Sequence, residues 1–361
     1  MSTRFETPIA PPNDEQTTAQ TEPIVDRPRR SVHTFLRNKR LMFLLRLSCT
    51  LLLFGLLFKS ISWPAILQKL SNLDDGGLLI GVIVGLFGVI ISAYQWQSLL
   101  DVEQMRMDLR RLINLYLVGI AFNHFLPTGM GGDIVKAYYV GKEGQNHVGS
   151  VSAVVMSRLT GFVGMLLVSV PTLLIAHSMF NTALSIAFLL SILAMCCALA
   201  LIFCLATLLP RIIPARWQDW SVLVSCLKVG RTMRRSMAHP RTLVPSILFG
   251  ACFHLVSALN YYSYAQVLHI PVSFGFYLLA IPFVSLIAFL PISINGFGLR
   301  EGALAYIFAT AHVPVATAVS LALLIDIQSL LMGALGGGIY LILGKLRHTS
   351  IHHTIQPAEQ S

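Results

Sequence analysis

Two cations occupy matching places in a motif that the sequence carries twice. The copies are Phe125-Leu126-Pro127 with Gly132 and Lys136, and Phe289-Leu290-Pro291 with Gly296 and Arg300. In each copy four residues separate the proline from the glycine, and three separate the glycine from the cation. Because proline ends a helix and glycine permits irregular backbone, each cation should follow a break in an apolar helix. Paired breaks in two halves of a membrane protein indicate a transport site.

New helices should begin just after the two breaks, near Gly132-Asp133 and after Asn295-Gly296. Free backbone N–H groups at a helix start, with a cation beside them, suit a phosphate or another anion. An arginine can hold a phosphodiester in a fork, whereas a lysine acts as a mobile point charge. The substrate-binding candidates of the motif are therefore Lys136, Arg300, Gly132, Gly296 and Asn295.

Four more charged residues lie beside the motif cations or inside apolar runs. Asp133 and Glu301 neighbour the cations in the sequence, and Arg158 and Asp326 fall deep within long apolar segments. Charges at such depth need a partner or water. We expect Arg158 to contact substrate, and Asp133, Glu301 and Asp326 to serve coupling or gating as candidate proton carriers. The alternative is a set of static buried pairs, or cations that snorkel to the interface.

The uncharged polar residues of the spans are expected to be structural. Asn123, His124, His254 and Asn260 should form hydrogen bonds between helices. Trp96 lies near the end of an apolar run, a position typical of the aromatic belt at the membrane interface.

Composition places the chain in the membrane. Hydrophobic residues make up 55% of the 361 residues, charged residues only 12%, and the mean hydropathy is +0.70. The net charge of +10 could suggest nucleic acid in a soluble protein, but most Lys and Arg residues fall between apolar runs. They are better explained as topology signals facing anionic lipid headgroups, and we expect no nucleic-acid partner.

The apolar runs predict an all-α polytopic fold with about six transmembrane helices. The runs long enough to span are 41–58, 78–100, 150–176, 183–209, 243–268 and 315–343, and the shorter ones are 112–126, 274–290 and 302–312. We expect residues 1–40 to form a disordered, basic cytoplasmic tail, residues 41–345 the membrane domain, and residues 346–361 a cytoplasmic C-terminal tail.

Positive charges orient these runs. The segment 210–242 is rich in Arg and should be cytoplasmic, whereas 177–182, 269–273 and 310–316 lack Lys and Arg and should lie outside. With both termini cytoplasmic, segment 112–149 must enter and leave from the cytoplasm and segment 274–312 from outside. The sequence therefore predicts two re-entrant hairpins in an inverted-topology repeat, with halves at about 78–209 and 243–343.

The motif regions resemble the flippase-like integral membrane domain of lysylphosphatidylglycerol synthases over about residues 40–345. The resemblance is carried by 122–136, by Ser157-Arg158-Leu159, and most specifically by Gly-Phe-Gly-Leu-Arg-Glu-Gly at 296–302. It implies an inner-membrane protein that moves a lipid between leaflets, here as a stand-alone member without the synthase domain. The implied substrates are phospholipids or polyprenyl-phosphate-linked lipids. Lys136 stands where this family commonly has Arg.

Three functions follow from these observations. The first is a lipid flippase or scramblase, in which Lys136 and Arg300 together hold a lipid phosphate near the midplane. A second is a membrane-embedded transferase with Asp133, Glu301 or His124 as base, and a third is an accessory subunit of a lipid-modifying enzyme. The sequence has no GxxxxGK[ST] motif, so we expect no ATP hydrolysis, and we expect no cofactor or metal. Partners would be a second copy of the chain or a lipid-synthesising enzyme.

Overall fold

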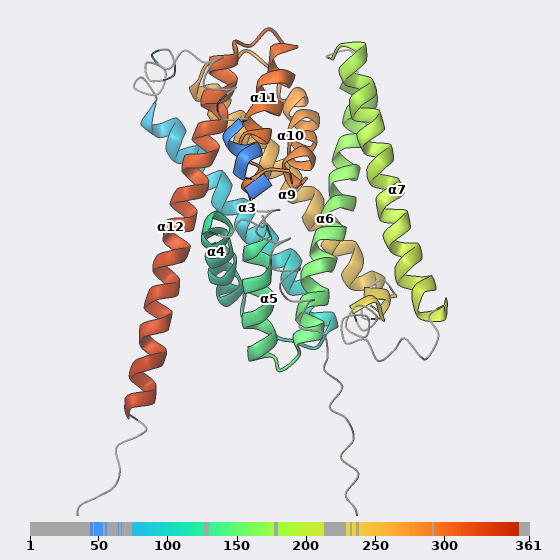
Figure 1. Cartoon of the computed structure of the whole chain (residues 1–361), viewed down its shortest axis with the longest axis vertical. Helices are drawn as coiled ribbons and strands as arrows, with labels where there is room; N and C mark the ends of the chain where they lie inside the picture. Colours follow the sequence, from blue (N-terminus) through green and yellow to red (C-terminus); the bar gives the residue numbers. More distant parts are fainter. Residues whose placement is uncertain are drawn as a thin grey trace, which may run out of the picture. The chain divides into compact units, whose positions relative to one another are not determined.

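A computed structural model gives the fold of the chain (Figure 1). It describes residues 44–45, 47–52, 55, 64, 66, 74–125, 130–176, 180–212, 229–231, 233–235, 238–290 and 292–353. The predicted tail at 1–40, part of the first predicted span at 41–58, and the motif prolines Pro127 and Pro291 lie outside these residues.

Five helices in the described part are long and apolar enough to cross a membrane. They are α3 (Asp75–Val102), α6 (His147–Ala176), α7 (Thr182–Ile212), α9 (Pro240–Val267) and α12 (Val315–His353). They correspond to five of the six spans predicted from the sequence, and the described residues contain no strand. The chain is thus an all-α polytopic membrane protein. One boundary differs, because α12 continues to His353, into the segment 346–361 that was expected to be a tail.

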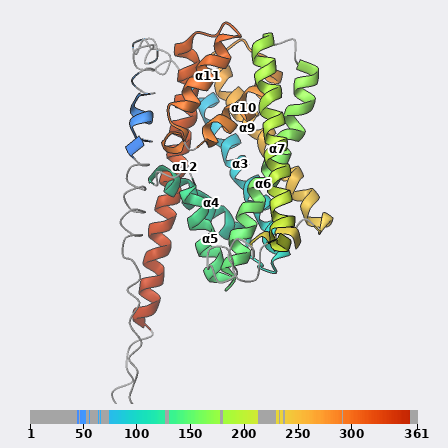
Figure 2. The same ribbon diagram turned by 45° about the vertical axis from the view of Figure 1, so that its right-hand side comes forward.

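Each copy of the motif separates two short helices. The first hairpin consists of α4 (Leu109–Phe125) and α5 (Gly131–Glu143). The second consists of α10 (Phe274–Phe289), the 3₁₀ turn η3 (Ile294–Gly296) and α11 (Leu299–Ala309). All four α-helices are shorter than the roughly 20 residues that cross a bilayer. Figures 1 and 2 show the first hairpin in the lower half of the molecule and the second in the upper half, so the two approach from opposite ends as predicted.

The ends of the spans follow the predicted alternation. In Figures 1 and 2 the end of α6, the start of α7 and the turn from α11 to α12 lie at the upper end, and the turn from α5 to α6 lies at the lower end. The charge-poor connections therefore share one face. At the opposite face Arg111 at the start of α4 pairs with Glu143 at the end of α5, which closes the first hairpin.

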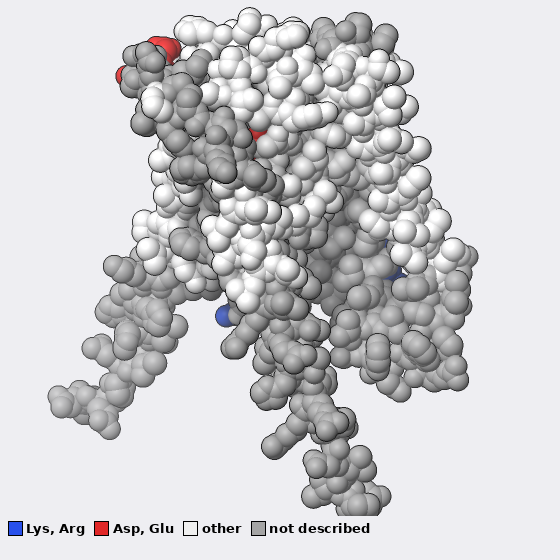
Figure 3. All heavy atoms as spheres, turned by 45° about the horizontal axis from the view of Figure 1, so that its top comes forward, with Lys and Arg blue, Asp and Glu red and all other residues white. Residues whose placement is uncertain are grey.

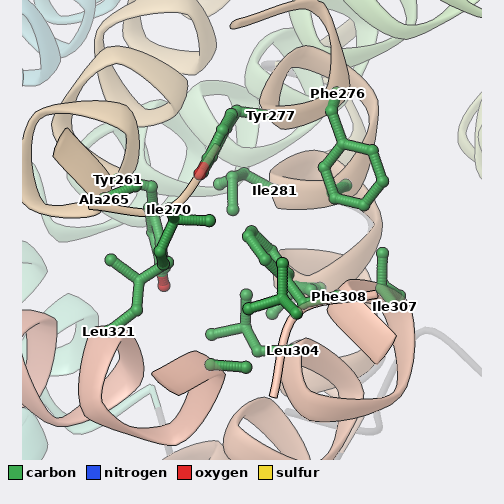
Figure 4. Packing of buried hydrophobic residues seen from close by; sticks show 14 of the residues in the cluster. Tyr261, Ala265, Ile270, Phe276, Tyr277, Ile281, Leu304, Ile307, Phe308 and Leu321 are labelled. Atoms are coloured by element: carbon green, nitrogen blue, oxygen red, sulfur yellow. The ribbon is translucent and has the colours of Figure 1, made fainter. Parts of the chain in front are cut away.

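Aromatic packing holds the two helices of the second hairpin together (Figure 4). Tyr277 on α10 packs edge-on against Phe308 on α11, with ring centroids 5.4 Å apart, and both side chains are fully buried. Phe276 packs against the same Phe308 ring at 5.1 Å. Because lipid tails are as apolar as these rings, the contacts gain van der Waals packing and the edge-to-face interaction, about 0.5–1.5 kcal/mol for each aromatic pair.

The outer surface is apolar. Figure 3 shows charged side chains only as small spots on a face that is otherwise white wherever it is described. On α7 the side chains of Leu189, Leu190 and Leu193 are all more than half exposed. Leucines in such positions face lipid tails in a membrane.

Candidate functional site

The first hairpin carries a buried cluster of one acid and two cations. Asp133 on α5 accepts from Lys136 Nζ at 2.8 Å through Oδ1. Its Oδ2 accepts from Arg158 on α6, from Nε at 2.8 Å and from Nη2 at 2.6 Å. The side chains of Asp133 and Lys136 are 5% and 7% exposed, whereas that of Arg158 is 40% exposed. With all three groups ionised the cluster has one positive charge in excess, and Arg158 is its accessible part.

Aromatic rings enclose Lys136. Its ammonium lies 3.7 Å from the centroid of Tyr116 on α4 and 5.4 Å from that of Trp96 on α3. Both distances are typical of cation–π contacts. Trp96 is 1% exposed. Its predicted place in the interfacial belt was therefore wrong, because the first hairpin covers the end of α3 on which it lies.

Gly132 lets the two helices of the first hairpin touch. A Cβ atom on Gly132 would lie 2.1 Å from the carbonyl oxygen of Gly119 on α4, so only glycine fits. The Gly132 N–H donates to Asn123 Oδ1 at 2.7 Å. Asn123 thus caps α5 and forms the interhelical hydrogen bond that was predicted for it. The Gly132 N–H at the start of α5 therefore already has a hydrogen-bond partner within the protein.

The second break is an irregular turn before α11. Asn295, Gly296 and Gly298 all have positive φ, at 52°, 75° and 81°. This left-handed conformation favours glycine and tolerates asparagine, which explains the residue types at the break. The Gly298 N–H donates to Glu301 Oε2 at 2.5 Å. Glu301, in the first turn of α11, thus caps the start of its own helix. The Ile294 N–H donates to Thr50 Oγ1 at 3.0 Å.

The second hairpin carries one cation and two acids. Arg300 Nη2 pairs with Asp326 Oδ1 on α12 and lies 3.6 Å from Glu301 Oε1. Glu301 and Asp326 are 2% and 7% exposed. Arg300 Nε and Glu301 Oε1 are buried and have no hydrogen-bond partner in the described part of the chain. With all three groups ionised this cluster has one negative charge in excess, the reverse of the first.

Arg300 opens onto a cavity of about 360 Å³ between α3, α9, α10 and α12, whose wall is partly apolar and includes Phe253 and Met332. Arg300 and Asn295 line it, together with the small polar side chains of Ser257, Ser285 and Ser329 and the amides of Asn260 and Gln328. The cavity lies within the spans, since Gly85 and Gly88 of central α3 form part of its wall. Its size falls in the range of small-molecule sites.

The amides of the cavity wall hold three spans together. Asn260 Nδ2 on α9 donates to Gln328 Oε1 on α12 at 2.9 Å, and Gln328 Nε2 donates to the Gly81 carbonyl on α3 at 3.1 Å. His124 of the first hairpin lies 3.1 Å from Ser329 on α12. These contacts confirm the interhelical role predicted for Asn260 and His124. Asn260 Oδ1 has no partner and is a vacant acceptor in the wall.

The structure groups the predicted site residues by hairpin. Gly132, Asp133, Lys136 and Arg158 gather at the first hairpin, and Asn295, Gly296, Arg300, Glu301 and Asp326 at the second. In the described part of the chain no contact joins Lys136 to Arg300, and Lys136 does not line the cavity of Arg300. The structure therefore places these two cations, expected to hold one phosphate together, in two separate clusters.

Several residues of the site carried a weak signal in the sequence. Gln328 and Ser329 follow Asp326 within one turn of an apolar helix, so the polar group on α12 is visible as a set. Tyr116 gives no such signal, because an aromatic residue in an apolar helix usually marks a core position. Gln95 on α3 bonds to Thr160 on α6 at 3.0 Å and belongs to a separate polar contact between spans.

Comparison with known proteins shows to which family the chain belongs. Searches of the curated proteins and of the solved structures give no match. The family model of the lysylphosphatidylglycerol synthase TM region matches residues 43–337, which include both hairpins and every residue of the two charged clusters. The chain therefore belongs to the lysylphosphatidylglycerol synthase transmembrane-region family.

Proposed function

We propose that the protein is a lipid flippase or scramblase that moves a phosphate-bearing lipid between the leaflets of the cytoplasmic (inner) membrane, with both termini in the cytoplasm. Family membership supports a role in membrane lipid biology. The observation that carries the proposal is the cavity at Arg300, because a partly apolar hollow whose wall also carries hydroxyls, amides and one guanidinium suits a lipid with a polar headgroup.

Arg300 is the proposed phosphate ligand. Its Nη2 is engaged by Asp326, but its Nε has no partner among the described residues, which leaves one donor for a ligand. A phosphodiester that enters the cavity could accept from this donor, and the vacant acceptor of Asn260 and the nearby serines could bind headgroup hydroxyls. The acyl chains would stay in the surrounding lipid while the headgroup passes between the hairpins.

The first cluster has a different part in the proposal. Lys136 is enclosed by Asp133, Tyr116 and Trp96 and acts as a structural charge. Arg158, with its 40% exposed side chain, is the cation of this cluster that a lipid phosphate can reach. The two arginines would thus serve successive phosphate positions, one near each hairpin, in place of a single clamp.

A flip assay tests the function. The purified chain is reconstituted into liposomes that contain phosphatidylglycerol labelled on an acyl chain, and a membrane-impermeant reductant bleaches the label in the outer leaflet. We expect complete bleaching with the protein, and a rate lowered about tenfold or more by Arg300→Gln, since a hydrogen bond to a charged group contributes about 1.5–3 kcal/mol. Arg110→Gln, at an exposed residue of α4, is the matched control and should bleach at the wild-type rate.

The same liposomes separate the other functions. Mass spectrometry of the recovered lipid would show a changed headgroup mass if the chain is a transferase, given a soluble donor. An accessory subunit would show neither flipping nor a mass change when it is reconstituted alone. A stable Arg300→Gln protein with the full wild-type flipping rate would contradict the assignment of Arg300.

A further inference from the structure

Among the described residues, the second cluster contains two acids and one cation, so one negative charge is not neutralised. Arg300 is the cation that pairs with Glu301 and Asp326 in the described part of the chain. Both carboxylates are more than nine-tenths buried. A phosphate that binds Arg300 adds another negative charge to this cluster, and such an excess is unfavourable where water is scarce.

The two acids differ in what holds them. Glu301 accepts the Gly298 N–H at 2.5 Å and lies in the first turn of α11, where the helix dipole stabilises an anion. Asp326 lies in the interior of α12, and Arg300 is its ion-pair partner. When a phosphate also binds the guanidinium, Glu301 keeps its backbone donor, whereas Asp326 has to share its counter-charge with a second anion.

We propose that binding of a lipid phosphate at Arg300 is coupled to the uptake of one proton by Asp326. The inference rests on the proposed function and adds its regulation. The proton comes from the bulk solution and binds a carboxylate oxygen of Asp326, so that the neutral acid, the lipid phosphate and Arg300 occupy the site together. By linkage, a lower pH strengthens lipid binding, and lipid binding draws a proton from solution.

The proton taken up by Asp326 must be distinguished from protons bound by other titratable groups near it. On α11 these are Arg300 and Glu301, and on α9 the phenol of Tyr261 lies near both. Tyr277 on α10 packs against Phe308 and Tyr262. On α4, His124 bonds to Ser329, three residues beyond Asp326, so its imidazole needs a control variant of its own.

Lipid binding at different pH tests the coupling. The probe is short-chain dioctanoyl phosphatidylglycerol, whose phosphodiester does not titrate in the range used, added to the purified full chain in detergent. Between about pH 8 and about pH 6 we expect the affinity of the wild type to rise by up to about tenfold for each unit of pH, the slope that one linked proton gives. In weak buffer a pH-sensitive dye should report uptake of about one proton for each lipid bound.

Three variants assign the proton. Asp326→Asn mimics the protonated acid, so it should bind the probe tightly at every pH and take up no proton. Glu301→Gln and His124→Gln should keep the wild-type slope. Thermal unfolding checks that each variant is folded. The dye measurement on the wild type does not depend on any variant.

The outcomes separate the two proposals. Wild-type binding that does not change with pH, or a slope that survives in Asp326→Asn, overturns the coupling and leaves the lipid site in place. A slope abolished by His124→Gln with Asp326→Asn unaffected would overturn it as well. Absence of probe binding at every pH would overturn both the coupling and the proposed lipid site.

Discussion

Arg158 on α6 and Asp133 on α5 are joined at one carboxylate oxygen by a hydrogen bond from Nε at 2.8 Å and an ion-pair contact with Nη2 at 2.6 Å. The other hairpin repeats this connection with the charges reversed, since Arg300 lies on the hairpin and Asp326 on the span that follows. In both halves an ion pair therefore fastens a re-entrant hairpin to the next helix. The third member of each cluster, Lys136 in the first and Glu301 in the second, gives the two clusters opposite excess charge, which is the basis for assigning them different roles.

Lys136→Gln should destabilise the protein. Lys136 is buried and contacts Asp133 at 2.8 Å and the ring of Tyr116 at 3.7 Å, so its loss leaves a buried acid with Arg158 alone. We expect a loss of about 1–3 kcal/mol, below the 3–5 kcal/mol of a fully broken buried pair because one cation stays. Thermal unfolding in detergent measures the change. Lys142→Gln, at an exposed residue of the same helix, should leave the melting temperature unaltered.

Gly132→Ala should separate the helices of the first hairpin. The added methyl group would lie 2.1 Å from the Gly119 carbonyl oxygen and 2.6 Å from its carbon, and backbone cannot move aside as a side chain can. Overpacking of this kind lowers the free energy of unfolding by about 1–3 kcal/mol. Gly302→Ala is the control, because nothing lies within 4 Å of its Cβ position, and it should be neutral or stabilising by up to about 1 kcal/mol. Equal stability of the two variants would contradict the close contact.

The sequence predicted the architecture because the membrane restricts the choices. Apolar runs shorter than a bilayer, placed between charge-poor and arginine-rich connections, leave few routes for the chain, and the hairpins follow from counting them. The left-handed turn at Asn295–Gly298 was also visible, since glycine and asparagine are the residues that such backbone favours.

The partners within the site could not be predicted in the same way. Pairing of Asp133 with Arg158 depends on the packing of α5 against α6, and no local pattern specifies that distance. Trp96 lies near the end of a span in the sequence. It is covered by the first hairpin, whose residues come later in the sequence. The cavity likewise arises from four helices, so its wall could be predicted only in part, through Asn295 and Arg300.

Glu103→Gln should make the fold less sensitive to pH. Burial raises the pKa of Glu103, just after α3, above its ordinary value of 4.5, and Arg235 opposes this more weakly. Because the folded-state pKa is raised, the stability from this group is greatest below the ordinary value and is lost as pH rises through the folded-state pKa. The variant should have a higher melting temperature than the wild type at neutral pH. The difference in melting temperature should vanish in acid. Asp108→Asn, at an exposed residue of the same connection between α3 and α4, is the control.

Single cysteines should reveal the two faces of the inverted repeat. In a background without native thiols, Lys142→Cys at the end of α5 should react with an impermeant maleimide only from the cytoplasm. Ala311→Cys in the turn after α11 should react only from outside, because the connection 310–316 has no Lys or Arg and lies at the opposite end of the molecule in Figure 1. Right-side-out and inverted membrane vesicles distinguish the two directions, and Ala183→Cys at the start of α7 should label together with Ala311→Cys. Labelling of Lys142→Cys and Ala311→Cys from the same side would contradict hairpins that enter from opposite faces, and with them the two successive phosphate positions at Arg158 and Arg300.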